Sequence, residues 1–139
     1  MFIRYNWPGL LWLILIFVIT GIPGNYIPRV AGFWEWLGPD KIIHLVIFGI
    51  FVYLLLLGFK KQYRFLNLRY HYIGYALFIG IIFGAITETM QKYVFIGRNA
   101  NIYDFAANFL GCLLGYLIYY IFKTKYNKKI RIFKNKLIF

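Results

Sequence analysis

Long apolar stretches alternate with short polar connectors along the whole chain. Four stretches come close to or exceed the roughly 20 apolar residues that a helix needs to cross a bilayer. They cover residues 7–22, 40–59, 72–93 and 103–122. The first resembles a signal peptide, but the segment from Thr20 to Gly24 is a poor cleavage site, and we interpret it as a retained helix. The pattern therefore predicts an all-α membrane protein, a compact four-helix transmembrane bundle.

The composition supports the same class. Of the 139 residues, 62% are hydrophobic and only 14% are charged, against about 25% charged in typical soluble proteins. A water-soluble domain of this size could not bury so much apolar surface, and a disordered chain would be far more polar. A single cysteine, Cys112, excludes an intrachain disulfide. We expect one transmembrane domain over residues 1–122 and a basic cytoplasmic tail over residues 123–139.

The charges predict the orientation of the bundle. Lys and Arg number 16 against 4 Asp and Glu, and in a membrane protein such an excess reports topology and contact with anionic lipid rather than nucleic acid. Twelve of the basic residues fall on one side of the predicted membrane: Arg4, Lys60, Lys61, Arg64, Arg69, Lys123, Lys125, Lys128, Lys129, Arg131, Lys134 and Lys136. By the positive-inside rule, both termini are cytoplasmic. We expect anionic lipids as partners at that face, and no nucleic acid.

A group of polar residues gathers on the opposite, outer side. Asp40 and His44 are four residues apart and so share a helix face, about 6 Å apart along the axis. The third and fourth predicted helices and their connector add further polar groups at a similar depth. The candidate binding residues are Asp40, Lys41, His44, Glu88, Gln91, Arg98, Asp104 and Asn108.

Glycines in the third and fourth helices support close packing around this group. Gly80, Gly84 and Glu88 share one face of the third predicted helix. Asn108, Gly111 and Gly115 share one face of the fourth. Small residues at such spacing let membrane helices approach backbone to backbone. That packing would turn the polar side chains away from lipid.

Several of these residues have simpler interpretations. Asp104 could close a capping box with Asn101 at the start of the fourth helix. Asp40 lies in a first turn, where the helix dipole stabilises an acid. Asn108 could simply bond to a neighbouring helix, and Arg98 could be a solvated connector charge.

Glu88 and His44 are harder to explain in this way. An ionisable group within a membrane helix is costly, and a functional role with a charged partner is the default hypothesis. For Glu88 that partner would be Arg98 or His44, and a structural ion pair is the alternative. His44 with Asp40, Glu88 and Asp104 would suit a divalent cation, but zinc sites usually recruit more His or Cys. We expect no metal and no cofactor.

The ordered set of motifs resembles the VanZ-like family of small bacterial membrane proteins. The resemblance covers about residues 39–115 and rests on Asp40-Lys41-Ile42-Ile43-His44, Glu88-x-x-Gln91 and Arg98-x-x-Asn101-x-x-Asp104-x-x-x-Asn108-x-x-Gly111. It implies a multi-pass protein of the bacterial cytoplasmic membrane with a role in the cell envelope, as in low-level resistance to the glycopeptide teicoplanin. It implies no particular reaction.

Three functions compete. The first is a polar outer-leaflet pocket that binds a lipid headgroup, a lipid-linked cell-wall precursor or a lipoglycopeptide. The second is an enzyme acting on an outer-leaflet lipid, with Glu88 and His44 as its acid–base pair. The third is a structural subunit of a larger envelope assembly, docked through residues 123–139. Binding needs a cavity at the polar group, whereas a structural cluster should be paired internally. We favour binding over catalysis.

Overall fold

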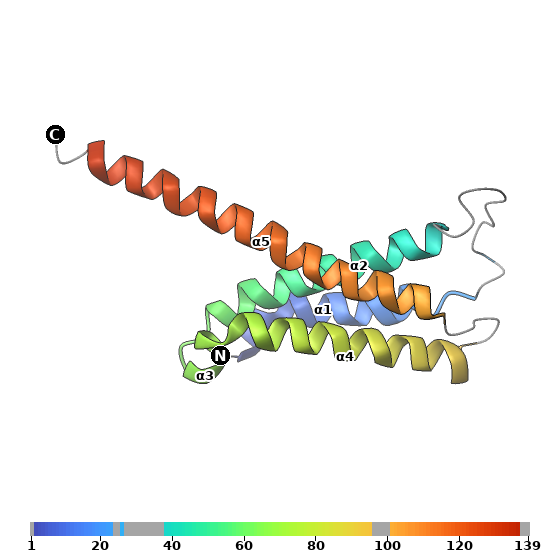
Figure 1. Ribbon diagram of the computed structural model, residues 1–139. Coiled ribbons are helices and arrows are strands. Elements are labelled where there is room, and N and C mark those ends of the chain that lie inside the picture. The colour runs from blue at the N-terminus through green and yellow to red at the C-terminus, as the bar shows by residue number, and fades with distance from the viewer. Residues whose placement is uncertain (1, 24–25, 27–37, 96–100, 137–139) are drawn as a thin grey trace.

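The computed structural model describes residues 2–23, 26, 38–95 and 101–136. In that part of the chain the regular structure is helical: α1 (Phe2–Thr20), α2 (Pro39–Lys60), α3 (Leu66–Tyr70), α4 (Tyr72–Tyr93) and α5 (Ile102–Lys136). All but the short α3 are long and apolar enough to span a membrane. Figure 1 shows these four helices side by side, and the start of α1 and the end of α5 lie toward the same end. The predicted all-α four-helix bundle is confirmed.

The helix bounds differ from the predicted spans at three places. α1 begins at Phe2 and includes Pro8. The connector after α2 contains the five-residue helix α3, which no apolar pattern indicated. α5 runs on to Lys136, because no glycine or proline follows Gly115 to interrupt it. The helix thus passes without a break from the predicted membrane domain into the predicted tail.

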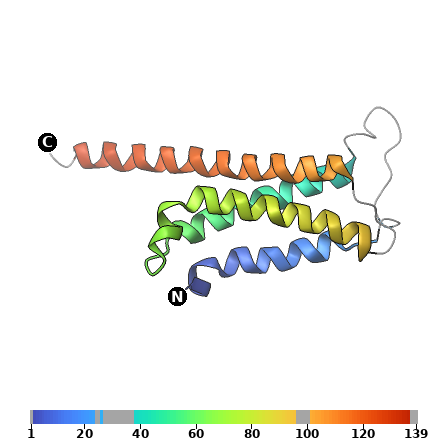
Figure 2. The ribbon, with the colours of Figure 1, turned by 60° about the horizontal axis from the view of Figure 1, so that its bottom comes forward.

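α2 is the central helix of the bundle, and α1, α4 and α5 pack around it (Figure 2). Large side chains of α2 fill the core because its polar residues are confined to its two ends. The most deeply buried ones, joined by Ile16 of α1, are Phe48, Phe51, Val52 and Leu56. Trp12 of α1 donates its indole N–H to the Ile47 carbonyl oxygen of α2 over 2.8 Å.

α2 and α5 approach each other through glycines. A Cβ atom added at Gly111 would strike the Leu45 carbonyl oxygen, and one added at Gly115 would strike the Gly49 carbonyl oxygen. Contact of this closeness is the role that small residues have in membrane helix packing. It brings the polar first turns of α2 and α5 together at the end of the bundle opposite the chain termini.

Candidate functional site

The first turns of α2 and α5 and the last turns of α4 place most of the predicted site residues together. The contacts described below join six of them, which are Asp40, Lys41, His44, Glu88, Asp104 and Asn108. The side chains of His44, Glu88, Asp104 and Asn108 are buried, although each carries polar or ionisable atoms. We call these six residues the polar cluster.

Asn108 lies at the centre of the cluster. Its Nδ2 donates to Glu88 Oε1 over 3.1 Å and lies 3.5 Å from the Gly84 carbonyl oxygen. Its Oδ1 is 2.8 Å from His44 Nδ1. Since the amide nitrogen is already donating, Oδ1 is the acceptor and His44 Nδ1 carries the hydrogen. One amide therefore connects α2, α4 and α5.

Glu88 also holds the beginning of α5. Its Oε2 accepts a hydrogen bond from the Asn101 backbone N–H over 3.4 Å, and the Asn101 side-chain oxygen accepts from the Tyr103 backbone N–H over 3.0 Å. In a capping box the side chain of the third helical residue, here Asp104, would accept the hydrogen bond from the Asn101 backbone N–H. In this structure the Glu88 carboxylate of α4 accepts that bond instead.

The Asp104 carboxylate is turned toward α2. Its Oδ1 lies 3.3 Å from the Lys41 ammonium nitrogen, in an ion pair between two largely buried side chains. That oxygen makes no hydrogen bond. His44 Nε2 lies 3.8 Å from Asp40 Oδ1 on the neighbouring turn of α2. The two aspartates thus approach the same region from different helices.

Two predicted site residues lie elsewhere. Gln91 is buried, but its Nε2 donates to the Thr20 carbonyl oxygen over 3.2 Å, so it joins α4 to α1. Arg98 lies outside the described residues. The described contact of Glu88 with another ionisable side chain is with His44, whose Nδ1 is 3.5 Å from Oε1.

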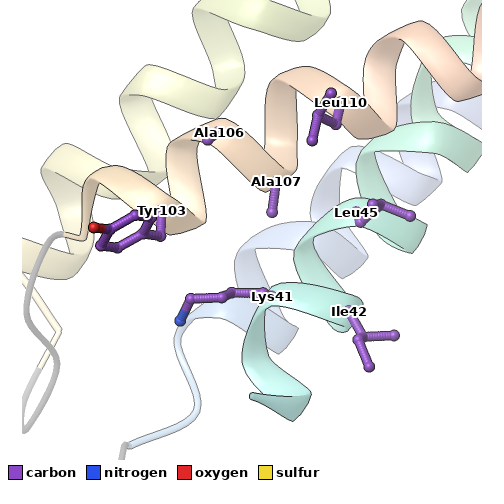
Figure 3. Close-up of a pocket in the computed structure, with 7 residues that line it drawn as sticks. All are labelled: Lys41, Ile42, Leu45, Tyr103, Ala106, Ala107 and Leu110. Atoms are coloured by element: carbon purple, nitrogen blue, oxygen red, sulfur yellow. The ribbon is translucent and has the colours of Figure 1, made fainter. Parts of the chain in front are cut away.

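A groove opens between α2 and α5 beside the polar cluster (Figure 3). It has a volume of about 320 Å³ and is lined by Lys41, Ile42, Leu45, Tyr103, Ala106, Ala107 and Leu110. We call it the α2–α5 groove. Only Lys41 among its lining residues was a predicted site residue, and the lining is apolar where the sequence suggested a polar pocket. The sequence signal for it was the pair of small residues, Ala106 and Ala107, one turn after Tyr103.

Together these features describe a multi-pass α-helical membrane protein with a buried polar cluster at one end of its bundle and an apolar groove beside it. The VanZ/LLP1 family model matches residues 9–123. The chain belongs to this family, as the motifs indicated. No curated protein and no solved structure matches the chain.

Proposed function

We propose that this chain binds an amphiphile in the outer leaflet of the bacterial cytoplasmic membrane. The headgroup lies at Lys41, and the hydrocarbon tail lies in the α2–α5 groove. A membrane lipid, a lipid-linked cell-wall precursor and a lipoglycopeptide share this combination of a polar head and an apolar tail. Low-level tolerance of glycopeptides is the physiological role that fits such binding.

The groove is the observation that carries the proposal. Its lining on α5 extends from Tyr103 to Leu110, a rise of about 10 Å along the helix. The groove is apolar apart from Lys41 and the Tyr103 hydroxyl, which belong to the first turns of their helices. Its volume of about 320 Å³ is at the small end of ligand sites. An acyl chain lying along α5 fits this shape.

The polar cluster supports binding better than catalysis. Glu88 and His44 are occupied by contacts with Asn108 and with each other, and neither lines the groove. A general acid or base must come within hydrogen-bonding reach of the reacting group. In this arrangement the pair instead fixes the relative positions of α2, α4 and α5, which form the walls and surroundings of the groove.

Filling the groove tests the proposal. Ala106→Trp puts a large side chain into the groove from an exposed position, and Ala85→Trp is its matched control on the exposed face of α4. Native mass spectrometry would measure retention of added phosphatidylglycerol, polyprenyl diphosphate and teicoplanin by the purified full-length protein. We expect Ala106→Trp to reduce retention of at least one of them roughly tenfold, about 1.4 kcal/mol, and Ala85→Trp to retain it. Equal retention by both variants would contradict the proposal.

A further inference from the structure

The geometry points to a binding site for a divalent metal ion formed by Asp40, His44 and Asp104. One oxygen from each carboxylate and one imidazole nitrogen all lie within 4.8 Å of one another. The residues come from the first two turns of α2 and the first turn of α5, and both His44 and Asp104 are buried. This site is distinct from the α2–α5 groove, and the inference does not depend on the proposed amphiphile.

The hydrogen-bonding state of His44 is the first argument. Its Nδ1–H is donated to Asn108 Oδ1 over 2.8 Å, so in the neutral imidazole Nε2 carries a lone pair. That lone pair faces the Asp40 carboxylate, with Oδ1 at 3.8 Å, and the imidazole is only 1% exposed. A cation between the imidazole nitrogen and this carboxylate would bind both. Metal-binding histidines typically donate their other N–H to a protein acceptor, as His44 does.

The charge of the polar cluster is the second argument. Glu88 and Asp104 are buried carboxylates, and Lys41 contributes the single ammonium group among the described residues of the cluster. Buried carboxylates favour the approach of a cation, because an ionised group is costly away from water. Asp104 Oδ1, which accepts no hydrogen bond and lies 3.3 Å from the Lys41 ammonium nitrogen, is among the candidate ligand atoms.

The ligand types define the class of metal. One imidazole nitrogen with two carboxylate oxygens suits Mn²⁺, and it suits Zn²⁺ with fewer nitrogen or sulfur ligands than zinc sites usually have. Mg²⁺ and Ca²⁺ prefer ligand sets made of oxygen alone. Three protein ligands also leave a coordination position open for water or a further group, which is the arrangement of non-structural zinc sites.

The test uses the metal alone. The full-length protein, stripped of metal in detergent, is titrated calorimetrically with Zn²⁺ and with Mn²⁺. We expect one equivalent to bind, and Asp40→Asn and Asp104→Asn to weaken binding by more than about tenfold. The matched control is His71→Gln, which removes the second of the chain's 2 histidines. His71 is exposed at the other end of the bundle, beside α3, and its loss should leave the affinity unchanged.

Two further measurements cover the case in which a ligand variant does not fold. Lys41→Met removes the ammonium group that competes for Asp104 Oδ1 at 3.3 Å, so it should tighten metal binding roughly tenfold. In the wild-type protein, electron spin-echo spectroscopy of bound Mn²⁺ should show coupling to one imidazole nitrogen, and this coupling should persist in His71→Gln.

Three results would overturn the inference. The first is that the wild-type protein binds neither ion. The second is that the ion is lost in His71→Gln but is retained in a folded Asp104→Asn protein. The third is that bound Mn²⁺ shows no coupling to nitrogen. None of these results bears on ligand retention in the groove, so the two proposals fail separately.

Discussion

At the scale of single residues, Glu88 links two helices with one carboxylate. One of its oxygens accepts a hydrogen bond from Asn108 Nδ2 of α5, and the other accepts one from the backbone N–H of Asn101, the residue before α5. Spacing alone predicted that Glu88 and His44 lie at a similar depth, but it left both Arg98 and His44 open as partners of Glu88. The two donors to Glu88 could not be predicted from spacing, because they depend on how α5 is rotated about its axis. Gln91, three residues later on α4, donates to the Thr20 carbonyl oxygen instead, which depends on how α4 packs against α1 and not on spacing along α4.

Replacing Glu88 by glutamine should lower stability. A glutamine has one acceptor oxygen where the carboxylate has two, so one of the two donors would face an NH₂ group. Leaving a buried donor unpaired costs about 1–3 kcal/mol. We expect a lower midpoint of thermal unfolding in detergent, with Lys92→Gln, an exposed charge one turn later on α4, as the unaffected control. An unchanged midpoint for Glu88→Gln would show that the two hydrogen bonds to α5 contribute little.

At the scale of helices, the pairing of α2 with α5 decides where the site forms. The stripe of Gly111 and Gly115 was visible in the sequence, but its partner was not, because a small-residue stripe says nothing about which helix it meets. In the structure the partner is α2, at Leu45 and Gly49. The groove follows from this pairing, since the helices touch closely at the glycines and Ala106 and Ala107 leave space nearer their first turns.

Gly115→Ala should therefore separate these two helices. The added methyl group would meet the backbone carbonyl of Gly49, which cannot move aside as a side chain could. Overpacking of this kind costs about 1–3 kcal/mol, and we expect a clear fall in the midpoint of thermal unfolding in detergent. Gly74→Ala on α4 is the control because a Cβ atom there meets nothing within 4 Å, so it should cause no loss. Similar midpoints for the two variants would argue against close α2–α5 contact.

At the scale of the whole molecule, the helix count could be predicted because each long helix is a continuous apolar segment. The end of α5 was harder to predict, because no glycine or proline follows Gly115 to end the helix. The orientation in the membrane remains a prediction from the distribution of basic residues. It matters for function because only one orientation places the α2–α5 groove in the outer leaflet.

Cysteine labelling tests this orientation. Tyr26, after α1, and Tyr70, at the end of α3, are matched aromatic positions that are 78% and 74% exposed. On intact spheroplasts, a membrane-impermeant thiol reagent should modify Tyr26→Cys and spare Tyr70→Cys. The native Cys112 is fully buried and should not contribute. Labelling of Tyr70→Cys alone would reverse the orientation and move the groove to the inner leaflet.

Because α5 is one unbroken helix, a tilt of one of its ends would also displace the other end. One of its ends forms a wall of the groove, and the other carries basic residues past the rest of the bundle (Figure 2). From the contact at Gly115 to Lys136 is about 31 Å at the rise of an α-helix. A tilt of about 10° pivoting on that contact would displace the far end by roughly 5 Å, on the same helical geometry. In a rigid α5, a small change of tilt at the groove wall would therefore be a larger displacement at the other end of the helix.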